Sequence, residues 1–268
     1  MSAALLLLAL APALPPSTVR GVNVTASLIP EQAWIRPGRS LVIGLRLQMA
    51  PEWHTYWKNP GDSGLPTRIR WTLPQGFEAG PIAWPTPERF ATNPLASYGY
   101  DQDVMLLSEV RTPAQVGSPV VIAARVDWLE CKDVCRPGKA ELAVQLEVTG
   151  NDPLPDPRWA KAFADTRARL PRSRPPGSLA ASAGAGGITL RGAAPAARDA
   201  YFFPARPDLV EHGAAQALTP EAGGFRLRIP MAANAKLPDS LEGVLVADGV
   251  GFEVAVPIRP RDSKGGAR

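Results

Sequence analysis

The chain is poor in the residues that build multi-metal scaffolds and in long apolar runs. Its 268 residues include only two Cys and two His, which excludes a protein held together by several zinc sites. Beyond the N-terminus no stretch reaches the roughly 18 apolar residues that a spanning helix needs. The mature chain is therefore expected to have no transmembrane segment.

The chain also has only a small excess of positive over negative charge. The 29 Lys and Arg residues are nearly balanced by 25 Asp and Glu residues, and the basic residues are scattered along the chain. Scattered cations argue against a nucleic-acid partner. Motifs for phosphate loops, dinucleotide binding, serine hydrolases and zinc proteases are missing as well, so no cofactor and no bound metal are expected.

What the chain has in quantity is Pro and Gly, with 30 and 24 residues, and short alternating strands. Interior Pro costs a helix about 3 kcal/mol, so long helices are disfavoured. Apolar and polar side chains alternate, with Pro- and Gly-containing turns between, over Leu41–Gln48, Arg68–Leu73, Val120–Trp128 and Leu142–Val148. This period of two predicts an all-β chain with an antiparallel β-sandwich.

One helix interrupts the strands. Asp156 is predicted as its N-cap, Pro157 as its first residue and Pro171 as its end. The stretch from Pro171 to Gly187 is rich in Pro, Gly, Ala and Ser and is predicted to be a linker. Strands resume after it at 188–191, 201–203, 225–229, 244–246 and 252–258, which predicts a second, smaller β-domain.

The N-terminus is typical of an export signal. Leu5–Leu10 is a short apolar run, followed by small residues that suit cleavage by a signal peptidase. These features divide the chain into a signal peptide at 1–20, a sandwich at 21–152, a helix and linker at 153–187, a second β-domain at 188–260 and a disordered tail at 261–268.

The two cysteines, Cys131 and Cys135, are the main chemical signal. If the four steps between them were extended, their Cα atoms would lie about 13 Å apart, whereas a disulfide needs about 4.4–6.8 Å. A bonded pair therefore requires a turn between the strand ending at Trp128 and the one starting near Ala140. Three interpretations remain open from the residues alone: a redox disulfide, a structural staple, and a soft-metal site such as Cu(I) that includes His54.

Four segments together resemble the N-terminal periplasmic domain of the DsbD/ScsB thiol–disulfide interchange reductases. They are Trp53–Pro66 (WHTYWKNPGDSGLP), Trp84–Phe90, Tyr98–Tyr100 and Val126–Gly138. The similarity covers about residues 20–150, and the later part more loosely resembles the second β-domain of ScsB-type ectodomains. The three residues between the cysteines match the ScsB-like branch, since the shorter DsbD domain has five.

The resemblance implies an immunoglobulin-like domain in the periplasm that passes electrons through Cys131 and Cys135 to thioredoxin-like partners. By the same resemblance, Cys135 faces partners and Cys131 resolves. A cap loop with an aromatic residue shields the disulfide in the family, which implies that Leu95, Tyr98 or Tyr100 plays this part here, although the family's Phe is absent at the nearest match.

Full-length reductases continue into a membrane domain and a thioredoxin-like domain, and this sequence contains neither. The expectation is a stand-alone ectodomain supplied by a separate membrane electron transporter, or a chain cut before its membrane domain.

The remaining polar and aromatic groups suggest packing or exposure rather than chemistry. Asp101, Asp103 and Glu109 are expected at a solvated strand edge, and His212 at the surface. The aromatic cluster of Trp53, Tyr56 and Trp57 is expected to pack in the core and at its edge.

Overall fold

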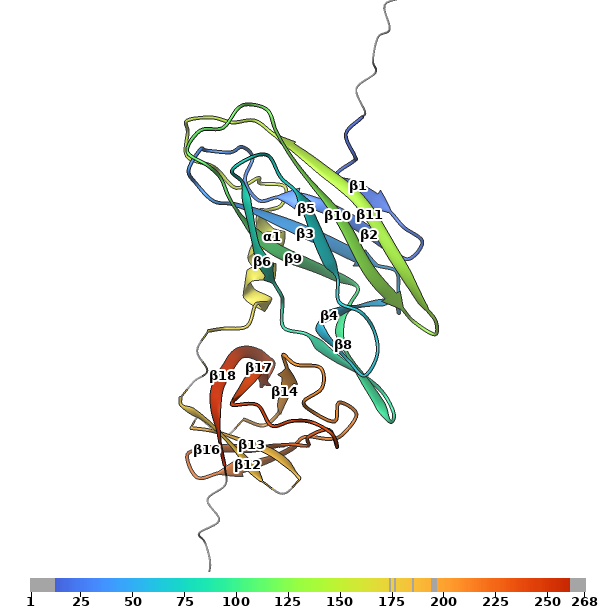
Figure 1. Cartoon of the computed structure of the whole chain (residues 1–268), viewed down its shortest axis with the longest axis vertical. Helices are drawn as coiled ribbons and strands as arrows, with labels where there is room; N and C mark the ends of the chain where they lie inside the picture. The colour runs from blue at the N-terminus through green and yellow to red at the C-terminus, as the bar shows by residue number, and fades with distance from the viewer. Residues whose placement is uncertain (1–12, 174, 176, 185, 194–196, 261–268) are drawn as a thin grey trace, which may run out of the picture.

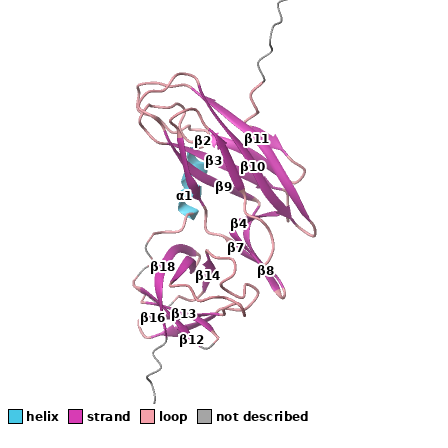
Figure 2. Cartoon of the chain, viewed as in Figure 1, coloured by secondary structure: helices cyan, strands magenta, loops and turns pink. Residues whose placement is uncertain are grey.

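The computed structural model describes residues 13–173, 175, 177–184, 186–193 and 197–260, and nearly all of its regular structure is β (Figures 1 and 2). The expected signal sequence lies mostly outside the described residues, as does the expected tail at 261–268. No helix among the described residues has the length and apolarity that a membrane crossing requires.

The first domain consists of two sheets packed face to face. One sheet has the order β1-β2-β3-β9-β6, and the other has the order β11-β10-β4-β8-β7 with β5 paired to β10. The strands are β1 (Thr18–Arg20), β2 (Val24–Pro30), β3 (Leu41–Met49), β4 (His54–Gly61), β5 (Arg68–Thr72), β6 (Glu78–Ala83), β7 (Glu88–Thr92), β8 (Leu95–Asp101), β9 (Asp103–Arg111), β10 (Val120–Cys131) and β11 (Cys135–Leu146). The predicted antiparallel sandwich is confirmed.

The alternation seen in the sequence is the reason why these strands pair as they do. The apolar positions of β3, from Leu41 to Leu47, and those of β10, from Val120 to Trp128, are at most 5% exposed. Both rows lie in one core between the two sheets. A shift of one residue in either strand would turn its apolar row toward water, so the pattern fixes the register.

Helix α1 (Ala160–Arg169) covers the outer face of the first sheet (Figure 1). Phe163 is 1% exposed and packs with Ile29, Met105 and Leu107. Leu170 leaves the helix in an extended conformation before Pro171, as predicted.

The predicted N-cap is wrong. The N-cap is Trp159, without a side-chain cap, whereas the carboxylate of Asp156 accepts the backbone N–H of Arg158 in the preceding turn. The Asp156 carbonyl then accepts the N–H of Ala160, so Asp156 shapes the turn that leads into the helix.

The second domain is one curved sheet with the order β14-β17-β18-β12-β13-β16-β15. Its strands are β12 (Leu179–Gly184), β13 (Gly187–Gly192), β14 (Ala200–Pro204), β15 (Ala217–Glu221), β16 (Gly224–Ile229), β17 (Ser240–Ala247) and β18 (Val250–Pro260). Strand β12 lies inside the stretch predicted as a linker. This part of the stretch is a strand rather than a linker, since its Ala and Ser residues pair with β13. It also runs parallel to β18, an exception to the antiparallel pattern.

The two domains share part of one core. Phe203 and Val244 of the second domain are buried in the cluster that fills the sandwich. Phe203 lies edge-on to Tyr98, with ring centroids 5.0 Å apart, and to Trp57 at 6.3 Å. The amide of Asn59, itself 1% exposed, donates to the carbonyl of Pro204 at 2.8 Å.

His212 lies in this interface, so the prediction that it is a surface residue is wrong. It is 3% exposed, and its Nδ1 lies 3.0 Å from the hydroxyl of Tyr98. Its Nε2 lies 2.6 Å from the carbonyl of Pro207. If Nε2 donates to that carbonyl, Nδ1 accepts from Tyr98, and both ring nitrogens are satisfied without water.

We predict that Phe203→Ala lowers the free energy of unfolding by about 3–5 kcal/mol, because it leaves a cavity in the shared core. Denaturant unfolding measures the loss. Leu237→Ala is the matched control, since Leu237 is 45% exposed and its truncation should change stability by about 0.5 kcal/mol or less. Equal effects of the two changes would contradict a core shared between the domains.

Candidate functional site

The two cysteines close the end of a long hairpin. Strands β10 and β11 remain paired up to Cys131 and Cys135, which face each other in register. Their Cα atoms are 4.1 Å apart and their sulfurs form a disulfide. The turn required by the spacing is thus present, although it contains only Lys132, Asp133 and Val134, since both strands extend further than predicted.

The two sulfur-bearing residues differ in exposure. Cys131 is 2% exposed, because β4 lies beside it, whereas Cys135 on the edge strand β11 is exposed. The loop between them is fixed to the rest of the domain by an ion pair of 2.5 Å between Lys132 and Glu52. A solvent-borne thiol can therefore reach Cys135 more easily than Cys131.

A row of four side chains crosses four neighbouring strands at this point. Cys135 pairs with Cys131, Cys131 pairs with His54 on β4, and His54 pairs with Asp101 on β8. Residues directly opposite each other on antiparallel strands place their Cβ atoms about 4.5–5.5 Å apart on the same face of a sheet. The disulfide, an imidazole and a carboxylate thus form one continuous row, which we call the redox row.

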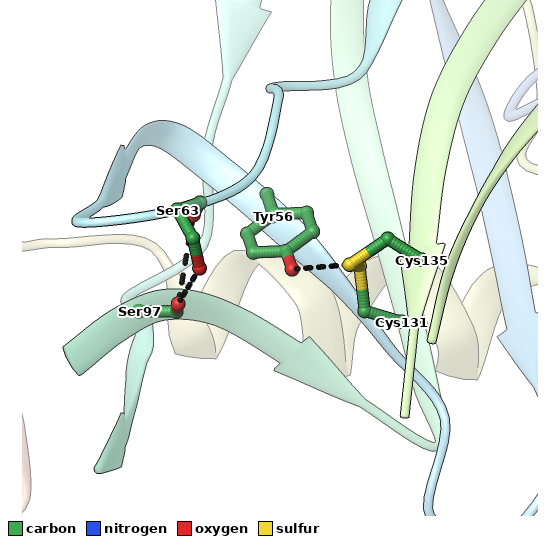
Figure 3. Close-up of a disulfide and its surroundings, with 5 residues drawn as sticks. All are labelled: Tyr56, Ser63, Ser97, Cys131 and Cys135. Atoms are coloured by element: carbon green, nitrogen blue, oxygen red, sulfur yellow. Dashed lines mark hydrogen bonds between the residues drawn. A yellow bond between two sulfur atoms is a disulfide. The ribbon is translucent and has the colours of Figure 1, made fainter. Parts of the chain in front are cut away.

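Tyr56 provides the side chain that contacts the disulfide. It lies two residues after His54, hence on the same face, and its hydroxyl is 3.8 Å from Cys135 Sγ (Figure 3). A disulfide sulfur has no proton, so the hydroxyl is the donor of this weak hydrogen bond. Burial raises the pKa of Tyr56 above its usual value, which keeps the phenol protonated and able to donate.

The loop after β4 folds back over Tyr56 and buries it. Gly64 has φ +107, and a Cβ built on it would lie 2.2 Å from the Tyr56 ring. Only glycine fits this position, for both backbone and steric reasons. The hydroxyl of Ser63 lies 3.0 Å from that of Ser97 on β8, which holds the loop in place (Figure 3).

His54 is enclosed by aromatic rings. It stacks on Phe90 with ring centroids 4.8 Å apart and meets Tyr56 edge-on at 5.2 Å. Burial lowers the pKa of His54 below its usual value, and the negative charge of Asp101 opposes part of that effect. Near pH 7 the imidazole is therefore mostly neutral.

Two of the three residues expected to form the cap, Tyr98 and Tyr100, lie elsewhere. Tyr98 contacts the second domain, and Tyr100 donates to the carbonyl of Pro85 at 2.7 Å. Both are buried in the core between the sheets, on the face of β8 opposite to Asp101. Leu95, at the start of β8, is 51% exposed. The aromatic side chains beside the disulfide and its histidine neighbour are instead Tyr56 and Phe90.

From the sequence, Tyr56 is expected among packing residues, and His54 joins the cysteines only under the soft-metal interpretation. Strand pairing, which sequence distance does not reveal, joins β4 to the end of β10. The spacing of two between His54 and Tyr56 within Trp53–Pro66 was the one sequence signal that could have predicted these two side chains on the same face of a strand. Trp57, which faces the other way, is a core residue at 1% exposure, as predicted.

For a metal, the arrangement offers Cys131, Cys135 and the adjacent His54, but the cysteines are bonded to each other. Among the described residues, no group of three or more His, Cys, Asp and Glu side chains is placed to hold a metal ion.

Comparison with known proteins agrees with this geometry. The family model "Thiol:disulfide interchange protein DsbD, N-terminal" matches residues 25–147, which include both cysteines, His54 and Asp101. The first domain is a DsbD/ScsB-like N-terminal domain. The DsbD-like sandwich thereby confirms the resemblance seen in the sequence.

A similar solved structure is the N-terminal periplasmic domain of ScsB from Proteus mirabilis, with a TM-score of 0.69 and 17% identity. The match covers 90% of this chain and 97% of that one, so the two proteins share a fold across both domains. The periplasmic chaperone SfaE matches 88% of this chain and 100% of its own at 10% identity, but its TM-score of 0.22 is too low to indicate a common fold. No curated protein sequence matches.

We predict that Gly64→Ala speeds reduction of the disulfide by dithiothreitol, because the added Cβ displaces the ring of Tyr56 from Cys135. Gly38→Ala is the matched control: Gly38 has φ +74 but open space around its Cβ position. Both changes cost about 1–2 kcal/mol of backbone strain, and only Gly64→Ala disturbs the site. Equal reduction rates in the two variants would show that Tyr56 does not shield the bond.

Proposed function

We propose that this protein is a periplasmic thiol–disulfide exchange protein, a protein-disulfide reductase component that passes electrons through the Cys131–Cys135 bond. The observation that carries the proposal is a disulfide at a hairpin end of a DsbD-like domain, with one cysteine buried and the other exposed. Exchange proceeds by attack of a thiolate on a disulfide sulfur through a mixed disulfide.

In this proposal Cys135 bonds to the partner and Cys131 resolves the mixed disulfide. The difference in exposure supports this order, because an incoming sulfur must approach along the axis of the bond that it breaks. Attack on Cys135 releases Cys131, which stays close by because the hairpin holds both residues in register.

The partners we propose are thioredoxin-like periplasmic proteins on one side and a separate membrane electron transporter on the other. Apolar surface around the hairpin supports a protein partner: Val134 at the loop tip is 55% exposed, and Leu65 is 60% exposed. A groove beside the hairpin is lined in part by Leu65, Pro66, Trp128, Leu129 and Pro137. Exposed apolar patches next to a reactive group are typical of docking surfaces.

The competing function is a binding module in which the disulfide is only a staple. The closed loop is short, so on the chain-entropy model the bond adds only about 2 kcal/mol of stability. The sandwich has a continuous core independent of this bond. A small contribution to stability favours exchange over a purely structural role.

We predict that Cys131→Ser accumulates a mixed disulfide between Cys135 and a thioredoxin-like protein, because no resolving thiol remains. Non-reducing electrophoresis and intact mass measure the adduct. Cys135→Ser is the matched control and should trap poorly, since Cys131 is buried. Equal trapping by both variants would reverse or remove the proposed order of attack, and trapping by neither would contradict exchange altogether.

The reduction potential of the wild-type bond separates exchange from a staple. We predict a value above about −300 mV, since structural disulfides of exported proteins lie below that potential. Equilibration with glutathione or dithiothreitol buffers measures it. A bond that resists reduction until the domain unfolds would identify a staple, and stoichiometric Cu(I) binding by the reduced protein would favour the copper-binding alternative.

Export is part of this proposal, and hydrogen bonds at the start of β1 support a cleavage site that precedes them. The carbonyls of Pro16 and Ser17 accept the N–H groups of Ala143 and Leu28, and β1 begins at Thr18. We predict that intact-mass analysis of the native periplasmic protein shows cleavage before Pro16, close to the small residues Ala11 and Ala13. A mature chain that retains Met1 would contradict export by a cleaved signal.

A further inference from the structure

Two titratable side chains of the redox row, His54 and Asp101, have no part in the exchange described so far. Each lies directly opposite its neighbour on the adjacent strand, so the order along the sheet is cysteine, histidine, aspartate. An imidazole between a thiol and a carboxylate is an arrangement that moves a proton to and from sulfur.

We propose that His54 accepts the proton of Cys131 when this thiol attacks, and returns it when Cys131 leaves as a thiolate, with Asp101 positioning the imidazole. The inference rests on the proposed function, because it concerns the same cysteine pair. His54 is the base in this scheme because it lies directly opposite Cys131 in the strand register, and Asp101, opposite His54 on β8, is a positioning residue.

The steps balance as follows. In the mixed disulfide between Cys135 and a partner, His54 takes the proton from Cys131 and becomes an imidazolium. The Cys131 thiolate attacks Cys135 Sγ, the Cys131–Cys135 bond forms, the bond to the partner breaks, and the partner leaves as a thiolate. The two cysteines are thereby oxidised and the partner is reduced.

In the reverse direction a partner thiolate attacks Cys135 Sγ. The bond between the two cysteines breaks, and Cys131 leaves as a thiolate. His54, which is neutral at rest, takes up the proton that the partner thiol released on ionising and passes it to the Cys131 thiolate, which prevents immediate reclosure. The partner is oxidised into the mixed disulfide, and a second thiolate of the partner completes the transfer.

The charges around His54 suit a side chain that is neutral in the resting protein and protonated only during the exchange reaction. Asp101 lies opposite it on β8 and its negative charge favours the imidazolium, while burial favours the neutral form. Burial and the charge of Asp101 raise the pKa of Glu88 on β7, and the charge of Arg169 of α1 opposes part of that effect. The neutral phenol of Tyr56 lies beside His54 on β4, and the Glu52–Lys132 ion pair at the hairpin loop largely cancels its own charge.

Cys131 requires a base for its attack because it is buried. An apolar environment raises the pKa of a thiol, and thiolate is the attacking species. The chain has few other bases to offer, as it contains only two His residues and His212 lies in the interface between the domains. Strand pairing places the remaining one directly beside Cys131.

Stopped-flow reaction of the reduced full chain with an aromatic disulfide that releases a coloured thiolate tests this role. Attack by Cys135 releases the first coloured equivalent, and attack by Cys131 on the mixed disulfide releases the second. We predict that His54→Gln leaves the first phase unchanged and slows the second at least about tenfold at pH 7. The difference in second-phase rate between His54→Gln and the wild type should shrink above about pH 9, where a thiol ionises without a base.

Asp101→Asn should slow the second phase less than His54→Gln does, and this smaller effect should also shrink at high pH. Glu109→Gln is the matched control, because Glu109 is an exposed carboxylate on β9, in the other sheet, and should leave both phases unchanged. The pH rescue separates catalysis from packing, since a change that only loosens the aromatic stack slows the second phase equally at every pH.

A second phase in His54→Gln that matches the wild type at pH 7, or that is slowed by the same factor at all pH values, overturns the role of His54. Those outcomes leave the exchange function intact, because the wild type still closes its disulfide. If the wild type itself releases only one equivalent, the exchange function fails together with this inference.

Discussion

The pairing of Cys131 with strands on both of its sides is the constraint on which the site depends. On one side its partner is Cys135, and on the other it is His54. The first pairing sets the Cα separation of 4.1 Å that the disulfide requires, and the second buries Cys131 while leaving Cys135 exposed. One register therefore decides which sulfur meets a partner, which sulfur resolves, and which side chain lies beside the resolving thiol.

The same strands are used on both of their faces. The outer faces of β4 and β8 hold His54, Tyr56 and Asp101, whereas their inner faces hold Trp57 and Tyr98, which pack against Phe203. The second domain thus rests on the back of the strands that form the site.

Local patterns predicted the parts of this structure that are set by local physics. Alternation in β3 and β10 identified the buried faces, and the distance limit for a disulfide required a tight turn between Cys131 and Cys135. The helix end at Pro171 followed from backbone chemistry. In contrast, Asp156 was assigned as the cap because an Asp before a Pro suits that place, whereas a further turn precedes the helix proper.

The parts that could not be predicted depend on which distant strands become neighbours. His54 lies 77 residues before Cys131 in the chain, and only the pairing of β4 with β10 brings them together. The sequence around His212 did not indicate that this residue is buried. It lies in the interface, where the hydroxyl of Tyr98, from the other side, is within hydrogen-bond distance of its ring. The expected cap residues followed the same rule: Tyr98 and Tyr100 alternate with Asp101 along β8, so once Asp101 faces the disulfide side, both tyrosines must face the core. The alternation within a strand can be read from the sequence, but which faces of β4 and β8 lie beside the disulfide depends on the pairing of Cys131 with His54 and of His54 with Asp101.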